Sequence, residues 1–167
     1  HVRGGVGSAS TPFVGYHALN SLRMEKAYRH WGHDIGTDDT PLEAGLGFAV
    51  AWDKPGGFIG RDRLLSLRDA GVSRHLVQLR LSNDDVLLHH NEPILRDGQY
   101  VGRVTSGAYG HTVGRSLALG YVSLEAGEST AGIEVGEGFV VDVGTDQVPA
   151  TASLRPAYDP GGSRLRS

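Results

Sequence analysis

The sequence contains no cysteine among its 167 residues, which excludes disulfide bonds, thiol nucleophiles and cysteine-ligated zinc or iron–sulfur clusters. Long apolar runs are also missing, since no stretch approaches the roughly 18 consecutive apolar residues of a membrane-spanning helix. Positive charge is scarce: 16 Lys and Arg stand against 19 Asp and Glu, for a formal net charge of −3. This balance excludes the broad basic surface of nucleic-acid-binding proteins. We therefore expect neither a membrane nor a nucleic acid as partner.

What remains is an ordinary globular composition, with 39% hydrophobic and 21% charged residues. The outlier is glycine, with 25 residues, most of them after residue 44, which predicts many turns in the second half. The first 14 residues form a leader, Gly/Ser-rich up to Ser10 and without the apolar core of a signal peptide, so we expect a cytoplasmic protein.

The first half of the chain has helical periodicity. Apolar residues within Tyr16 to Trp31 recur at helical spacing, with Gly32 as a plausible stop. Leu46 to Trp52 alternates weakly and is interpreted as a buried strand. A second, shorter helix is expected from Arg61 to Ala70, ended by Gly71.

After residue 74 the period changes to two, which is typical of strands. His75 to Leu81 alternates cleanly, and Asp97-Gly98 is a strong hairpin signal between two further strands. The other expected strands are Pro93 to Arg96, Gln99 to Thr105, Ser116 to Val122, Ile133 to Val135, Phe139 to Val143 and Gln147 to Leu154. The sequence thus predicts an α+β fold: a helical segment, a boundary near residues 71 to 75, and a compact antiparallel barrel or sandwich.

Residues capable of chemistry are scattered. His30 and His33 lie three apart, but Gly32 interrupts any shared helical face, and the neighbours His89 and His90 point in opposite directions on a strand, so we expect no metal site. The glycine-rich stretch of residues 102–107 lacks the spacing of a nucleotide-binding loop. No catalytic residue is assigned.

The aromatic residues of the first half leave two interpretations open. Tyr28, Trp31, Phe48, Trp52 and Phe58 could stack on a flat heterocyclic ligand, or they could form the core between the two segments.

Several strings together resemble one family, the folate-dependent aminomethyltransferases of the glycine-cleavage T-protein type. They are NSLRMEKAY at Asn20 to Tyr28, WGHDI at Trp31 to Ile35, TPLEAGL at Thr40 to Leu46, FIGR at Phe58 to Arg61, GRVTSG at Gly102 to Gly107 and LALGYV at Leu117 to Val122. The resemblance covers residues 15 to 166 in order. It implies that residues 15–72 end a folate-binding domain and that 73–167 form a jelly-roll-like C-terminal β-barrel, with 1–14 unmatched.

One branch of the family fits best. Leu19 and Asn20 stand where the glycine-cleavage enzyme usually has an Arg-Asp pair, whose arginine helps to hold the folate. With RHWGHD at Arg29 to Asp34, the chain resembles the C-terminal region of dimethylglycine and sarcosine dehydrogenases and oxidases. These flavoproteins oxidise an N-methyl amine and capture the one-carbon unit on tetrahydrofolate.

The resemblance also sets expectations for the site. Tetrahydrofolate is the expected cofactor, with Tyr28 as the main folate-binding residue and Phe48 and Tyr158 as weaker ones; FAD is expected only on another domain. The family's catalytic aspartate belongs to an upstream part, so we expect a fragment. We also expect the missing N-terminal half, a partner subunit or a second copy to cover Leu19, Leu22 and Met24. The alternative is a non-catalytic binding or subunit-interaction module derived from the family.

Overall fold

The computed structural model describes residues 13–124, 133 and 138–166. Along the chain its elements are α1 (Tyr16–Glu25), the 3-10 turn η1 (Gly47–Ala49), α2 (Arg61–Ala70), β1 (Arg74–Leu81), β2 (Pro93–Arg96), β3 (Gln99–Gly110), β4 (Arg115–Ser123), β5 (Phe139–Asp142), β6 (Gln147–Ser153) and the 3-10 turn η2 (Ser163–Leu165). Helices and a barrel occupy separate halves of the sequence, which confirms the predicted α+β fold. The domain bounds 15–72 and 73–167 stay a prediction.

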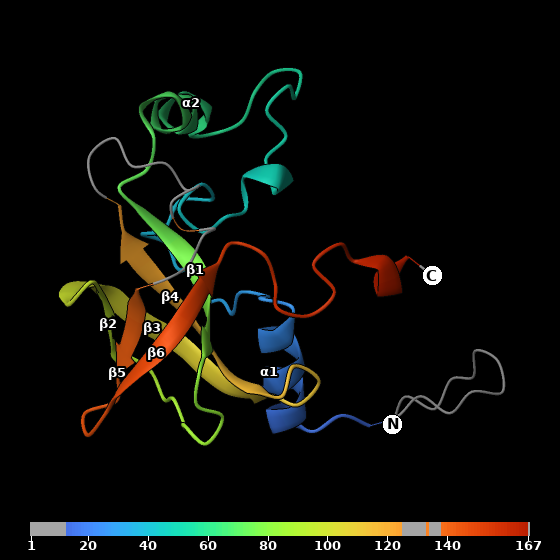
Figure 1. The fold of residues 1–167 in the computed structure, drawn as a ribbon. Coiled ribbons are helices and arrows are strands. Elements are labelled where there is room, and N and C mark those ends of the chain that lie inside the picture. Colours follow the sequence, from blue (N-terminus) through green and yellow to red (C-terminus); the bar gives the residue numbers. More distant parts are fainter. Residues whose placement is uncertain (1–12, 125–132, 134–137, 167) are drawn as a thin grey trace, which may run out of the picture.

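The six strands close into an antiparallel barrel in the order β1-β4-β3-β2-β5-β6, seen at the lower left of Figure 1. Its interior is filled by aliphatic side chains and one ring, among them Leu79, Ile94, Val104 and Phe139, each at most 2% exposed. Because every strand pairs on both sides, the barrel is a closed unit with its own core. The expected strand Ile133 to Val135 lies outside the described residues except for Ile133, which is buried in this core.

The hairpin at Asp97-Gly98 is confirmed. Asp97 and Gly98 have φ angles of 52° and 78°, the pair of positive values that a two-residue turn between right-twisted strands requires. β3 then continues to Gly110 and is interrupted by a bulge between Val104 and Ser106. The bulge turns Thr105 outward, toward the segment that follows α1.

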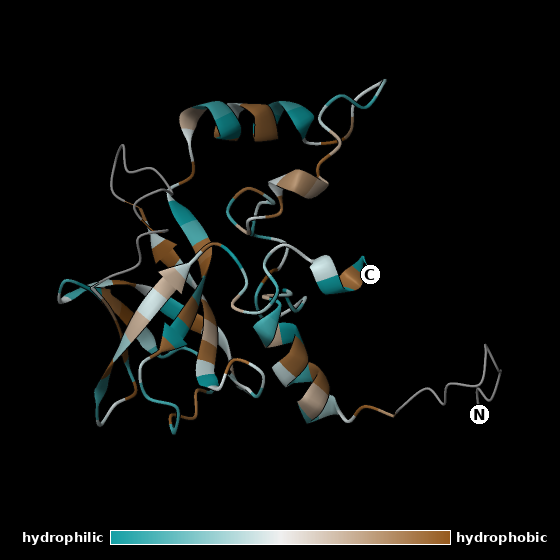
Figure 2. Ribbon diagram, turned by 45° about the vertical axis from the view of Figure 1, so that its right-hand side comes forward, coloured by the Kyte–Doolittle hydropathy of each residue, from teal (hydrophilic) through white to brown (hydrophobic). Residues whose placement is uncertain are grey.

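α1 packs on the outside of the barrel against β3 and β4. Met24 is fully buried in a second core with Leu76, Leu117 and Leu119. The expectation that another chain covers Met24 is therefore wrong, because the barrel of this chain already covers it. Figure 2 shows the alternation of hydrophobic and hydrophilic residues along α1.

Two local predictions are wrong. α1 ends at Glu25 rather than at Trp31, because Ala27 adopts a left-handed conformation (φ 51°) and Tyr28 N–H returns to the carbonyl of Arg23 at 2.9 Å. Leu46 to Trp52 forms no buried strand but the turn η1, with Phe48 exposed. No strand of the barrel is left unpaired to take up Leu46 to Trp52, because the six strands close on one another.

α2 is confirmed, and Gly71 ends it with a φ of 81°. Each of its residues is at least partly exposed, and the helix lies above the barrel in Figure 1. Among the described residues, no helix has the length and apolar character needed to cross a membrane.

Candidate functional site

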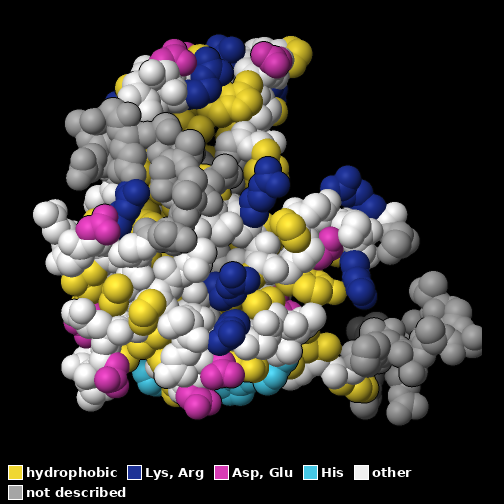
Figure 3. Space-filling view, viewed as in Figure 1, with side chains coloured by type: hydrophobic (Ala, Val, Ile, Leu, Met, Phe, Trp, Pro, Cys, Tyr) yellow, Lys and Arg dark blue, Asp and Glu magenta, His cyan; other side chains and the backbone are white. Residues whose placement is uncertain are grey.

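An apolar pocket of about 270 Å³ lies between α1 and the segment that follows β6. It is lined by Leu19, Leu22, Arg23, Lys26, Tyr28, Tyr158, Asp159, Arg164 and Leu165. Figure 3 shows hydrophobic side chains exposed between basic ones where α1 and the C-terminal segment lie. The fold thus brings together two of the three predicted folate-binding residues, Tyr28 and Tyr158, from opposite ends of the sequence.

Tyr158 is placed by the side chain of Gln78 on β1. This buried amide donates to the carbonyl of Met24 in α1 and accepts from Ala157 N–H at 2.6 Å. Next along the chain, Tyr158 N–H donates to the carbonyl of Glu25 at 3.0 Å. The chain after β6 is therefore attached to the end of α1 through the barrel wall.

Asp159 organises the last turn of the site. Its carboxylate accepts from Ser163 N–H (2.9 Å) and Oγ (2.8 Å), and Lys26 Nζ lies 3.2 Å from its Oδ2. Hydrogen bonds from Ser163, and from Lys26 next, lower the pKa of Asp159 from 3.8 to about 2. Because Asp159 holds η2 against α1, Leu165 becomes part of the pocket wall.

Tyr28 is held by a buried ion pair below it. Arg23 Nη1 donates to the carbonyl of Tyr28 at 3.3 Å and to Asp34 Oδ2 at 2.6 Å. The Asp34 side chain is fully buried and also accepts from His30 N–H (2.8 Å) and from Thr105 Oγ1 (2.6 Å). The bulge of β3 thereby fixes the turn that carries Tyr28.

Two further arginines attach residues 36–45 to the same region. Arg29 donates to the carbonyls of Ala27 (2.9 Å) and Ala44 (3.0 Å), and burial lowers its pKa. Arg74 on β1 donates to Glu43 at 2.9 Å, and this hydrogen bond raises the pKa of Arg74. These contacts make the loop after α1 a fixed part of the barrel surface.

The aromatic residues divide between site and surface. Tyr28, Trp31 and Phe48 are 51%, 65% and 87% exposed, so the core interpretation does not hold for these three. Phe48 lies on η1 and does not line the pocket, which leaves Tyr28 and Tyr158 as its rings. Leu165 and the pair of Lys26 with Asp159 were not predicted, and no sequence pattern marks them.

The lining of the pocket combines apolar area with positive charge at its border. Two aromatic rings and three leucines offer apolar area to a flat ligand, and Arg23, Lys26 and Arg164 place positive charge at its border. Asp159 is the one lining carboxylate, and its oxygens already accept hydrogen bonds. Among the described residues, no three His, Asp or Glu side chains are arranged to hold a metal ion.

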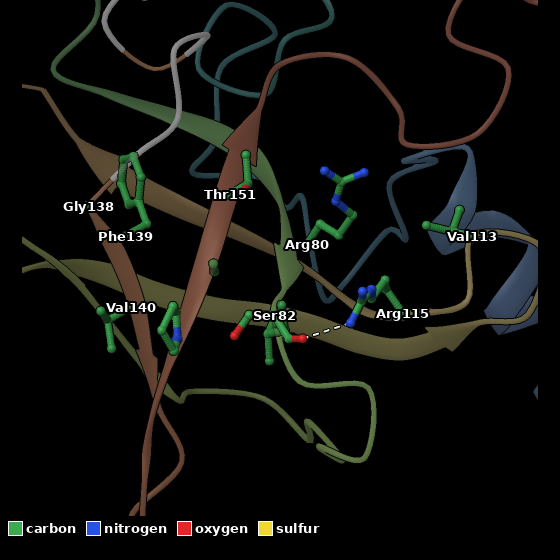
Figure 4. A pocket seen from close by; sticks show the side chains of 11 residues that line it. Arg80, Ser82, Val113, Arg115, Gly138, Phe139, Val140 and Thr151 are labelled. Atoms are coloured by element: carbon green, nitrogen blue, oxygen red, sulfur yellow. Dashed lines mark hydrogen bonds between the residues drawn. The ribbon is translucent and has the colours of Figure 1, made fainter.

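A larger open cavity of about 630 Å³ lies on the barrel itself (Figure 4). Arg80 of β1, Ser82 just after β1 and Thr151 of β6 line it, and Arg115 Nη1 donates to the carbonyl of Ser82 at 2.8 Å. Its lining includes none of the predicted site residues. The sequence and the structure together therefore favour the pocket beside α1.

Two protein-family models match parts of this chain. The family model for the glycine cleavage T-protein C-terminal barrel domain matches residues 74–159, and that for the GCVT N-terminal domain matches residues 7–54. A 4-methylaminobutanoate oxidase (formaldehyde-forming) of Paenarthrobacter nicotinovorans is 47% identical over 153 residues, 92% of this chain and 18% of that protein. The mitochondrial dimethylglycine dehydrogenase of Mus musculus is 39% identical over 154 residues, 91% of this chain and 17% of that protein.

This chain therefore spans less than a fifth of the length of these two relatives. Among solved structures, the glycine cleavage system aminomethyltransferase T from Bartonella henselae superimposes with a TM-score of 0.72 at 24% identity, over 86% of this chain and 38% of that one. At this identity the likeness shows the shared fold. The chain belongs to the glycine-cleavage T-protein family, whose C-terminal barrel it carries, and its relatives include both aminomethyltransferases and dimethylglycine and sarcosine dehydrogenases.

Proposed function

We propose that this chain forms one part of a tetrahydrofolate site in an N-methyl amine demethylating oxidoreductase of the dimethylglycine and sarcosine dehydrogenase type, or in a related aminomethyltransferase. Its role there is to help capture the one-carbon unit on tetrahydrofolate. The observation that supports this role is the meeting of Tyr28 and Tyr158 in one apolar pocket beside Leu19 and Leu22. Oxidation of the amine belongs to a flavin on another domain.

The lining of the pocket fits a planar ring. Tyr28 is half exposed, so one face of its ring can be covered by a ligand without disturbing the core. Leu19 occupies the position at which the resemblance places a folate-holding arginine, so an apolar contact there replaces a charged one. Phe48 stays a weaker candidate, because it can reach only a ligand that extends beyond this pocket.

The proposal is tested by titrating tetrahydrofolate into this chain, alone and combined with the upstream folate-domain region, and into the variant Tyr28→Ala. Loss of one stacking ring costs on the order of 1 kcal/mol, so we expect a five- to tenfold weaker affinity. The measurement is isothermal titration calorimetry, with circular dichroism to show that each protein is folded.

Tyr28→Phe is the matched control, since it keeps the ring and removes only the hydroxyl. It should bind nearly as tightly as the unmodified chain if stacking dominates. Equal affinities of the unmodified chain and Tyr28→Ala, both folded, would show that Tyr28 does not contact the folate.

A second candidate function is a non-catalytic module that binds a partner subunit. It is favoured by the large apolar side chains left exposed outside the pocket, such as Phe48 (87%) and Ile59 (104%). In that case neither form of the chain binds tetrahydrofolate, and Tyr28→Ala changes only association with the partner.

A further inference from the structure

A second pocket beside α1 gathers five of the eight histidines of the chain. It has a volume of about 230 Å³ and is lined by Tyr16, His17, Asn20, Arg23, His30, His33, His89, His90, Thr105, Ser106 and Gly107. Histidine side chains gather along the lower edge of the molecule in Figure 3. Such a concentration of one residue type, drawn from three separate segments, needs a reason beyond packing.

The fold brings these segments together by two local features. In the turn after α1, the rings of His30 and His33 lie 4.8 Å apart, edge to face. On β3, Gly107 permits a close approach, because a Cβ at this position would lie 2.3 Å from Cβ of Leu88. The neighbours of Leu88, His89 and His90, are thereby held against β3 at the border of the pocket.

The pocket offers donors and no carboxylate. Imidazole, guanidinium, hydroxyl and amide groups can all donate hydrogen bonds, and among the described residues no Asp or Glu lines the pocket. The Asp34 carboxylate beneath it is occupied by Arg23, His30 N–H and Thr105. Glu92, two residues after His90, accepts from His89 N–H at 2.7 Å through Oε1 and is not part of the lining. Its Oε2 is buried and has no hydrogen-bond partner in the described part of the chain.

One lining residue of the pocket has a buried polar atom without a hydrogen-bond partner. Nδ1 of His30 is buried and has no hydrogen-bond partner in the described part of the chain. A buried polar atom without a partner costs free energy, so such atoms are usually satisfied by a ligand or by ordered water. The arrangement does not suit a metal ion, because no three potential ligands among the described residues are placed to share one.

We propose that this histidine pocket binds a small polyanion that carries carboxylate or phosphate groups. The imidazoles and Arg23 donate to its oxygens. The site is separate from the apolar pocket and shares with it one residue, Arg23. It does not depend on the proposed role in folate binding.

The test is a titration of the full chain with succinate and, separately, with sodium phosphate, followed by NMR of the imidazole C–H groups. Sodium chloride at equal ionic strength controls for screening. We expect saturable shifts of His17, His30, His33, His89 and His90, and none of His111, which is exposed outside the pocket. Saturation by succinate alone would show that the pocket binds carboxylate groups, and saturation by phosphate alone would show that it binds phosphate groups.

Two variants remove single donors, His30→Ala at a partly buried position and His33→Ala at an exposed one. A hydrogen bond to a charged group is worth enough that each should weaken binding about tenfold. His111→Ala is the matched control and should bind like the unmodified chain. Shifts no larger than those in sodium chloride, or equal affinities of all variants, would overturn the proposal.

Discussion

The amide of Gln78 connects three parts of the chain that are far apart in sequence. It lies on β1, donates to α1 at Met24 and accepts from Ala157 after β6. A glutamine has both a donor and an acceptor group, and here each has found a backbone partner in a buried setting. The apolar pocket that contains Tyr28 and Tyr158, the tyrosine pocket, therefore depends on a residue that does not line it.

Asp159 makes the stability of the C-terminal wall of the pocket depend on pH. A carboxyl whose pKa is lower in the folded state stabilises that state above its ordinary pKa, and this contribution is lost as the pH falls through the folded value. With a pKa lowered from 3.8 to about 2, the contribution of Asp159 should be complete above about pH 4 and vanish toward pH 2.

We expect Asp159→Asn to unfold in less urea than the unmodified chain at neutral pH, with the difference shrinking between about pH 4 and pH 2. Urea unfolding followed by circular dichroism across this range measures it. Asp38→Asn, at an exposed loop position, is the control and should differ little at any pH. A difference for Asp159→Asn that is constant down to pH 2 would show that the carboxylate charge is not what anchors η2.

At the scale of elements, β3 and β4 approach each other closely at Gly102. A Cβ on Gly102 would lie 1.8 Å from the carbonyl oxygen of Tyr121, a distance that no side chain can tolerate. The two strands can remain paired there only because residue 102 has no side chain.

Gly102→Ala should therefore destabilise the protein by about 2–3 kcal/mol, the cost of forcing atoms into a packed structure. Thermal unfolding measures the change. Gly161→Ala is the control, because the same methyl group there meets nothing within 4 Å. Equal melting temperatures for the two variants would mean that the strands separate at no cost.

The elements that the sequence predicted well are those with local signals. Gly71 ends α2 and Asp97-Gly98 turns the hairpin, and both signals depend on backbone angles that few other residues adopt. The end of α1 was not predicted because its cause is the left-handed conformation of Ala27. Alanine rarely adopts this conformation, so the residue type gives no signal for a helix end. The apolar pattern at Leu46 carries no information on strand pairing, and the barrel closes without this segment.

The site was predictable to a smaller degree. Tyr28 and Tyr158 came from the family resemblance, and no pattern in the sequence places them side by side. Their meeting depends on Gln78, whose amide has no sequence signature. The histidine pocket was not predictable for a similar reason: His30 with His33 and His89 with His90 are separate pairs in the sequence, and Gly107 brings the two pairs to one place only in the fold.

At the scale of the whole molecule, α1 leaves a hydrophobic strip facing outward. Leu19 and Leu22 are 56% and 52% exposed beside the half-exposed Tyr28. Soluble monomers seldom expose contiguous apolar patches of large area. The part of the partner expectation that concerned these two leucines therefore stays a prediction, although Met24 is excluded from it.

We expect the chain to self-associate through this strip as its concentration rises, and Leu19→Gln with Leu22→Gln to shift it toward monomers. Sedimentation velocity over a hundredfold concentration range measures this. Ile59→Gln, at an exposed apolar position away from α1, is the control. A single monomeric species at every concentration, without binding of a dye specific for apolar surface, would contradict the expectation.

The closure of the barrel has a consequence for how the chain folds. β1 pairs with β6, the first strand with the last, whereas β2 with β3 and β3 with β4 are neighbours in sequence. Contacts between distant segments carry a high entropic cost before they contribute stability, and high contact order slows folding to milliseconds or seconds. The hairpins can form early, but the β1–β6 pairing must wait until the last strand is in place. Because Gln78 lies in that pairing and also holds Ala157, the tyrosine pocket can assemble only at the end of folding.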